Sequence, residues 1–139
     1  MGAEANGKLL YLDSSALVKL VLREAESDAL LRSLGAWPAC VTSELAYVEV
    51  VRAARRAAAD PAVERRAEEV LAAVHLLKID GELLSQAGRL EPRTVRALDA
   101  LHLASALSLG DDLGAMAIYD AALAAAAAAC GIAVLAPAG

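Results

Sequence analysis

Cysteine and aromatic residues are scarce in this sequence. Its 139 residues include two cysteines, one tryptophan, three tyrosines and no phenylalanine. Cys40 and Cys130 lie far apart in no CxxC or Cys/His cluster, so we interpret them as small buried hydrophobic residues in a reducing compartment. Four aromatic side chains are too few for a platform on which nucleic-acid bases stack.

The chain also lacks a long apolar run and an excess of basic charge. Its longest apolar stretch, 121–130, falls well short of the roughly 20 residues that span a bilayer. The opening MGAEANGK has no basic region followed by an apolar one, as a signal peptide requires. Thirteen basic and eighteen acidic side chains give a net charge of −5, which argues against a large basic surface but leaves a local basic patch open. We expect a cytoplasmic protein with no membrane partner.

Hydrophobic residues, many of them alanine, make up 58% of the chain. This content excludes intrinsic disorder, and the length favours one domain over 1–139, with 1–7 a loose N-terminal extension. Short apolar runs predict strands at 8–12, 40–42, 74–79, 115–119 and 132–135, the third of them buried. Longer periodic segments predict helices at 16–24, 43–59, 61–73, 81–90, 95–109 and 121–130, with Thr94 capping the fifth. Strands that alternate with helices indicate an α/β fold with a mostly parallel central sheet of about five short strands.

Two aspartates directly follow predicted strands. Asp13 comes after KLLYL, and Asp120 comes after AMAIY. In an open parallel sheet, ligands bind outside the carboxyl ends of the strands, so both side chains are expected at that edge. Either aspartate alone is also explained as a helix N-cap, because its carboxylate accepts hydrogen bonds from free backbone N–H groups.

Two further acids stand in apolar helical segments. Asp99 is the only formal charge in ALDALHLASAL, and a carboxylate in a buried helix is costly unless it is paired or bound to a metal. A pair with Arg96 or a hydrogen bond to His102, each three residues away, is the structural alternative. Glu49 stands between valines, and a pair with Arg52 is worth little beside the cost of desolvating the acid.

These four acids are more informative together than singly. Two come from strand ends, and two come from helices that begin on the same side of the sheet. Converging carboxylates repel one another and stay ionised only if cations occupy the site. Magnesium (Mg2+) or manganese (Mn2+) suits such oxygen ligands, lowers the pKa of a bound water and neutralises charge on a phosphodiester. The pattern therefore predicts a divalent metal site for phosphodiester hydrolysis.

Four segments carry a resemblance to a known family. They are YLDSSALVKL (11–20), TSELAYVEVVRAARR (42–56), ALDALHLASAL (97–107) and IYDAALAAAAAACGIAVLAP (118–137). In this order and spacing the chain resembles the PIN-domain ribonucleases, and most closely the VapC toxins of bacterial toxin–antitoxin pairs. No single segment is very specific, but the four in order are, and they span essentially the whole chain. The resemblance implies a single PIN-like domain.

The resemblance also implies a function and a set of site residues. The activity is metal-dependent endonucleolytic hydrolysis of RNA, and the partners are an RNA substrate, a cognate antitoxin and a second copy in a homodimer. Glu49 rather than Glu44 matches the family's helix acid, and Ser14 matches a residue that supports the first aspartate. Ile118 departs from the family's usual threonine or serine. The acidic quartet that binds Mg2+ or Mn2+ and catalyses cleavage is Asp13, Glu49, Asp99 and Asp120.

The basic residues nearest to the predicted site divide into two groups. Lys19 and Arg52 lie close in sequence to proposed ligands, so we consider them candidate contacts for RNA or the antitoxin. Arg55 and Arg56 are expected to pair with glutamates on a solvated face. His102 is interpreted as a packed, hydrogen-bonded side chain outside the metal site.

A catalytically inactive PIN-like protein-interaction module is the alternative function. Metal binding that depends on Asp13 and Asp99 separates the two, because an inactive module keeps the fold and the partner but loses the metal. In either case the apolar stretches 16–22 and 46–51 are expected to supply a groove for a partner helix or strand.

Overall fold

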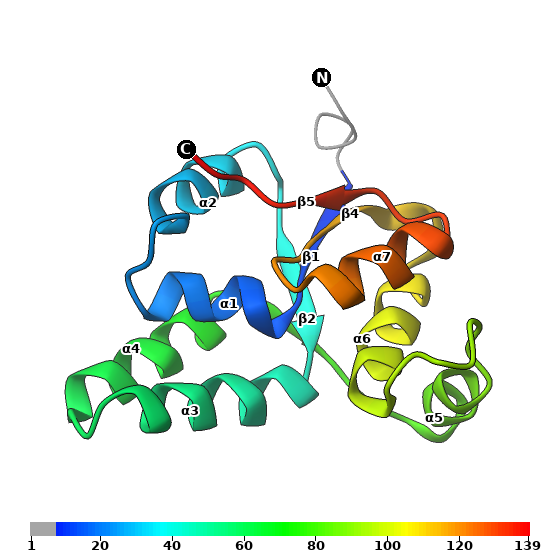
Figure 1. Ribbon diagram of the computed structural model, residues 1–139, viewed down its shortest axis with the longest axis horizontal. Helices are drawn as coiled ribbons and strands as arrows, with labels where there is room; N and C mark the ends of the chain where they lie inside the picture. Colours follow the sequence, from blue (N-terminus) through cyan, green and yellow to red (C-terminus); the bar gives the residue numbers. More distant parts are fainter. Residues whose placement is uncertain (1–7) are drawn as a thin grey trace.

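The computed structural model describes residues 8–139, so the predicted extension 1–7 lies outside it. Five parallel strands form one sheet in the order β3-β2-β1-β4-β5 (Figure 1). They are β1 (Leu9–Leu12), β2 (Cys40–Ser43), β3 (His75–Leu77), β4 (Leu113–Ala117) and β5 (Val134–Leu135). The last residues of β1 and β4, Leu12 and Ala117, are register partners. The chain segments that follow these two strands therefore leave the sheet side by side.

Seven α-helices connect and cover the strands (Figure 1). They are α1 (Ser14–Val21), α2 (Ser27–Leu34), α3 (Leu45–Ala57), α4 (Pro61–Ala72), α5 (Gly81–Gly88), α6 (Ala97–Leu107) and α7 (Ala121–Ala129). The strand period of two divides the core between the two faces of the sheet. Leu10 and Leu12 pack with residues of α1 to α4, whereas Tyr11 packs with residues of α6 and α7. Both faces of β1 are thus covered by helices.

The α/β architecture confirms the predicted fold class, and local signals explain several boundaries. Asp60 accepts a hydrogen bond from the backbone N–H of Ala62 at 2.9 Å, and Pro61 is the first residue of α4. A proline suits this position because it needs no N–H donor there. Gly131, with a φ of 81°, lies just after α7, where a glycine tolerates the left-handed conformation that ends a helix.

Three predictions about local structure are wrong. The eight-residue α2 falls in a segment for which no helix was predicted, because its continuous apolar signal is only the three residues 29–31. β3 is an edge strand with His75 and Leu76 exposed, not a buried one. Thr94 caps no helix, because α6 begins after Arg96 and its N-cap makes no side-chain hydrogen bond.

The cysteines are free thiols, and each is only half-buried rather than buried. Burial raises the pKa of Cys40, which makes its thiolate less available. Among residues 8–139, no helix is long and apolar enough to cross a membrane.

Candidate active site

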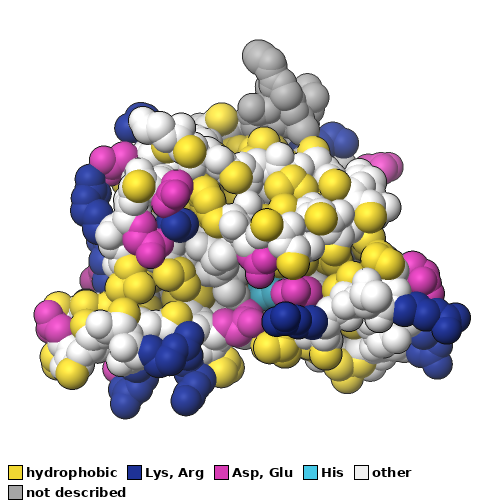
Figure 2. Space-filling view, in the orientation of Figure 1, with side chains coloured by type: hydrophobic (Ala, Val, Ile, Leu, Met, Phe, Trp, Pro, Cys, Tyr) yellow, Lys and Arg dark blue, Asp and Glu magenta, His cyan; other side chains and the backbone are white. Residues whose placement is uncertain are grey.

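The four predicted acids come from four different parts of the fold. Asp13 follows β1 and caps α1, and Asp120 lies three residues beyond β4 and caps α7. Glu49 lies in α3, and Asp99 lies in the first turn of α6. In Figure 2, acidic and basic side chains lie side by side at the centre of this face, where Figure 1 shows α1, α3, α6 and α7 approaching one another.

Asp13 is a buried carboxylate with several hydrogen-bond donors. Its side chain is 3% exposed. One oxygen accepts a hydrogen bond from the backbone N–H of Ala16 at 2.9 Å, and the Ser15 hydroxyl lies 2.7 and 2.9 Å from the two oxygens. Burial raises the pKa of Asp13 although these donors act against the shift. The protein therefore holds a negative charge where desolvation opposes it.

Asp99 and Asp120 form the more open side of the site. Asp120 is exposed and accepts hydrogen bonds from the backbone N–H groups of Ala122 and Leu123 at 2.9 and 3.4 Å. Partial burial raises the pKa of Asp99, and the nearby carboxylates of Asp120 and Glu49 raise it further. Within residues 8–139, Asp99 forms neither the ion pair with Arg96 nor the hydrogen bond to His102 that the structural alternative requires. Asp99 therefore lies within electrostatic range of Asp120 and Glu49.

Glu49 is held by a histidine from across the site. His102 Nε2 lies 2.8 Å from Glu49 Oε1, and His102 Nδ1 lies 2.7 Å from the Tyr11 hydroxyl. That hydroxyl accepts a hydrogen bond from the backbone N–H of Ser43 at 3.1 Å. Burial alone would raise the pKa of Glu49, but hydrogen bonds from His102 and Ser14 outweigh it and lower the pKa. His102 is thus the packed, hydrogen-bonded side chain that was predicted, and α6 is tied to α3 through it.

The two serines after Asp13 have different partners from those predicted. Ser14 donates to Glu49, whereas the hydroxyl on Asp13 comes from Ser15. Ser15 Oγ also accepts a hydrogen bond from the backbone N–H of Tyr119 at 2.9 Å. Ser14 therefore supports the helix acid, and Ser15 links the ends of β1 and β4. A sequence offers little to choose between adjacent serines, because their directions depend on where α1 begins.

The donor set fits a hard divalent cation in its chemistry. All four acids supply oxygen ligands of the kind that Mg2+ and Mn2+ prefer, and a cation would relieve the effect of Asp120 and Glu49 on Asp99. With the present side-chain orientations, however, no three His, Cys, Asp or Glu side chains between residues 8 and 139 are arranged to hold an ion. Glu49 is turned toward His102 and Ser14.

Two hollows meet at Asp120. The first has a volume of about 420 Å³ and contains Ser14, Lys19, Glu49 and Arg56 in its lining. The second, of about 400 Å³, contains Arg96, Asp99 and an alanine face of α7. Asp120 lines both hollows. Glu49, Asp99 and Asp120 therefore line two adjoining hollows, whereas the buried Asp13 lines neither.

The predicted basic contacts differ in their surroundings. Lys19 lies at the first hollow, but its ammonium group pairs with Glu24 and Glu26 at 3.0 and 2.8 Å. Arg52 is exposed on α3 and lines neither hollow. Arg56 does line the first hollow, because it lies seven residues, or two helical turns, after Glu49. The helical period was the signal that could have identified Arg56.

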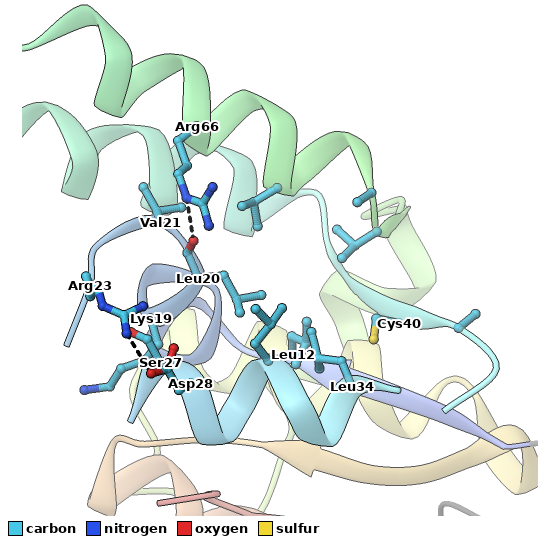
Figure 3. A pocket seen from close by; sticks show the side chains of 15 residues that line it. Leu12, Lys19, Leu20, Val21, Arg23, Ser27, Asp28, Leu34, Cys40 and Arg66 are labelled. Atoms are coloured by element: carbon cyan, nitrogen blue, oxygen red, sulfur yellow. Dashed lines mark hydrogen bonds and ion pairs between the residues drawn. The ribbon is translucent and has the colours of Figure 1, made fainter. Parts of the chain in front are cut away.

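A separate apolar groove lies between α1, α2 and α4 (Figure 3). Its volume is about 510 Å³, and Leu20, Val21, Leu31 and Val70 are among its lining residues. The prediction that 46–51 supplies the second wall is wrong, because none of those residues lines the groove. Ala46 and Val50 are instead buried in the core beneath α3.

The sequence and the fold are similar to those of known proteins. The sequence model described as PIN domain matches residues 10–114. Ribonuclease VapC46 of Mycobacterium tuberculosis is 45% identical over 128 residues, which cover 92% of this chain and 97% of that protein. Ribonuclease VapC35 of the same species is 40% identical over 138 residues, covering 93% and 97%. The crystal structure of M. tuberculosis VapC20, a sarcin-ricin loop cleaving toxin, matches the fold with a TM-score of 0.68 and 21% identity, over 84% of this chain and 94% of that one.

Proposed function

Because this chain belongs to the PIN domain family, we propose that it is an endoribonuclease and the toxin of a toxin–antitoxin pair. Relatives that align along nearly their whole length bear the name ribonuclease. The observation in the structure that carries the proposal is that Glu49 and Asp99 line two hollows that share Asp120. Repelling carboxylates at the carboxyl edge of a parallel sheet suit cation-assisted hydrolysis of an anionic substrate.

We assign the metal ligands to Asp13, Glu49, Asp99 and Asp120, and the ion to Mg2+ or Mn2+. When bound, such an ion supplies an activated water and neutralises charge on the phosphodiester. The backbone N–H of Ala16 and the Ser15 hydroxyl fix the Asp13 carboxylate in one orientation. Asp99 lacks comparable donors among the described residues, so its side chain is free to turn toward a ligand.

His102 and Ser14 give Glu49 a different role from that of the aspartates. Their hydrogen bonds keep its carboxylate ionised and directed along the face of α6. Glu49 must exchange at least part of these bonds to meet a cation together with Asp99. We therefore expect Asp13 and Asp99 to contribute most to metal affinity and Glu49 to contribute less.

The proposed protein partners are a cognate antitoxin and a second copy of the chain in a homodimer. The apolar groove between α1, α2 and α4 suits a helix of the antitoxin. Lys19 lines both this groove and the hollow that contains Glu49 and Asp120. A segment that leaves the groove beside Lys19 therefore reaches the active site directly and can block it.

The test combines metal binding with RNA cleavage. Thermal unfolding of the partner-free protein is measured with and without Mn2+, for the wild type and for Asp13→Asn. A ligand at 100 times its dissociation constant adds about 2.7 kcal/mol, which is a rise of roughly 5 °C for a domain of this size. Purified protein is then incubated with total bacterial RNA, and new 5′ ends are mapped in Mn2+ and in EDTA.

We expect Mn2+ to stabilise the wild type, to have little effect on Asp13→Asn, and to produce discrete cleavage sites only with the wild type. Each increment is compared within one variant, because removing the buried charge of Asp13 changes the stability of the metal-free protein by itself. A folded protein that shows neither the rise nor the cleavage would instead be the catalytically inactive interaction module.

A further inference from the structure

Basic side chains that no acid already neutralises are candidate contacts for the substrate. Near the site, Lys19 pairs with Glu24 and Glu26, and Arg55 pairs with Glu64 at 2.7 Å. Arg56 and Arg96 are exposed, and neither guanidinium forms an ion pair with any carboxylate in residues 8–139. These two arginines also line the two hollows that meet at Asp120.

A cation at the position of Arg96 does not stabilise the helix that begins there. It is the N-cap residue of α6, and it makes no side-chain capping hydrogen bond. The positive end of a helix dipole lies at the N-terminus, so a basic side chain there is unfavourable and an acid or a neutral capping residue is favoured. The positive charge of Arg96 does act on Asp99, whose pKa it lowers against the larger effect of burial. Arg96 therefore lies close to the carboxylates, but its guanidinium forms no ion pair with any of them.

Arg56 occupies the corresponding place on the other side. It lies on the same stripe of α3 as Glu49, and its hollow also contains Ser14 and Tyr119. Arg56 shares its hollow with Glu49, Arg96 shares its hollow with Asp99, and Asp120 lines both hollows. A phosphate chain that crosses from one hollow to the other past Asp120 therefore meets one arginine in each hollow.

We propose that Arg56 and Arg96 bind RNA phosphates on opposite sides of the scissile bond and so set the path of the substrate across the carboxylates. The inference rests on the proposed ribonuclease function. Arginine suits this task because its planar fork donates two hydrogen bonds to one phosphate. Such contacts position the backbone and carry no base specificity of their own.

The test measures RNA binding in an Asp99→Asn background, in which the RNA is expected to remain uncut. Asp99 accepts no hydrogen bond within the described residues, so asparagine leaves no donor unpaired. A fluorescent single-stranded RNA is titrated in Mn2+ at several salt concentrations, and the dissociation constant is obtained from anisotropy. Arg56→Gln, Arg96→Gln and the double variant are compared with Arg65→Gln, which removes the same charge from an exposed site on α4 outside both hollows.

Each site variant is expected to weaken binding about tenfold at low salt. The slope of log K against log salt should fall by about 0.7 for each lost phosphate contact, and by about 1.4 in the double variant. Arg65→Gln should leave the slope unchanged. Arg96→Lys should keep the salt slope but bind RNA more weakly than the parent. Lysine retains the positive charge but cannot donate the two parallel hydrogen bonds of the guanidinium. In the active protein, the same substitutions should raise KM and leave kcat within about twofold.

Equal slopes for Arg56→Gln, Arg96→Gln and Arg65→Gln in a protein that cleaves RNA would overturn this inference and leave the ribonuclease function intact. A wild type that does not cut RNA, together with a background variant that does not bind it, would overturn both. Melting curves accompany each variant, and Arg96→Gln should melt no lower than its parent because it removes a cation from a helix N-terminus.

Discussion

Asp13 and Asp120 are the same local motif in two different surroundings. Each follows one of two neighbouring strands, β1 or β4, and each caps the next helix by accepting a backbone hydrogen bond at 2.9 Å. Asp13 is 3% exposed, and burial raises its pKa. Asp120 is exposed to solvent. Both carboxylates cap a helix, although Asp13 accepts from the third residue after it and Asp120 most closely from the second, so the larger difference lies in what surrounds each carboxylate.

The comparison shows that capping alone does not explain Asp13. Asparagine or serine caps a helix about as well as aspartate and brings no charge into a buried site. Ser15 supplies a further hydrogen bond to Asp13 and also accepts one from Tyr119, which ties the buried carboxylate to the chain that leads to Asp120. Asp13 thus keeps a buried charge that helix capping does not require, and the proposed cation site accounts for it.

The largest predicted effect tests whether the two caps are also catalytic. Asp13→Asn and Asp120→Asn keep the capping oxygen but remove a charged ligand, so we expect RNA cleavage in Mn2+ to fall by at least about 100-fold in both. Initial cleavage rates provide the measurement. Asp60→Asn is the matched control, because Asp60 caps α4 with the same 2.9 Å contact outside the site. If Asp120→Asn behaves like Asp60→Asn, Asp120 is a cap and nothing more.

The second prediction isolates the cap from the charge by comparing alanine with asparagine at each position. At residue 13, alanine should be about 2 kcal/mol less stable than asparagine, since the buried N–H of Ala16 loses its acceptor. At residue 120 the difference should be about 0.5–1 kcal/mol, because water can replace the lost oxygen at an exposed helix end. Urea unfolding at one pH measures both differences. Equal differences would mean that burial does not distinguish the two caps.

Much of this fold follows from local sequence signals. Short apolar runs between capping residues locate all five strands, and strand–helix alternation predicts the parallel sheet. The eight-residue α2 was missed because its apolar signal is so short. β3 was misread as buried because its apolar composition resembles that of an interior strand, whereas its place at the sheet edge depends on the tertiary order of the strands.

The acids of the site could be predicted from the sequence, but the hydrogen-bond network that connects them could not. Their positions at strand ends and in apolar helices are visible in the sequence, and so is the two-turn spacing from Glu49 to Arg56. The contact between Glu49 and His102 joins residues 53 positions apart on different helices. No local pattern encodes that contact, and the same holds for the finding that Ser15, and not the predicted Ser14, donates to Asp13.

The smallest predicted effect is the pH dependence that the buried carboxylate gives to folding. Because the pKa of Asp13 is raised in the folded protein, the folded state binds a proton here more readily than the unfolded chain does. This contribution to stability is full below about pH 4 and is lost as the pH rises through the raised pKa. Asp13→Asn removes the titration, so its stability relative to the metal-free wild type should increase with pH over that window and then level off.

Unfolding free energies of the wild type, Asp13→Asn and Asp120→Asn, measured in EDTA at a series of pH values, check this sign. The difference between Asp13→Asn and the wild type cancels the titration of other groups, including Glu49, whose lowered pKa acts in the opposite direction. This difference should rise with pH, whereas Asp120→Asn also alters the pKa of Asp99, which the Asp120 carboxylate raises. A difference that falls with pH would mean that the donors on Asp13 stabilise its charge more than burial opposes it, and the contrast between the two aspartates would then reverse.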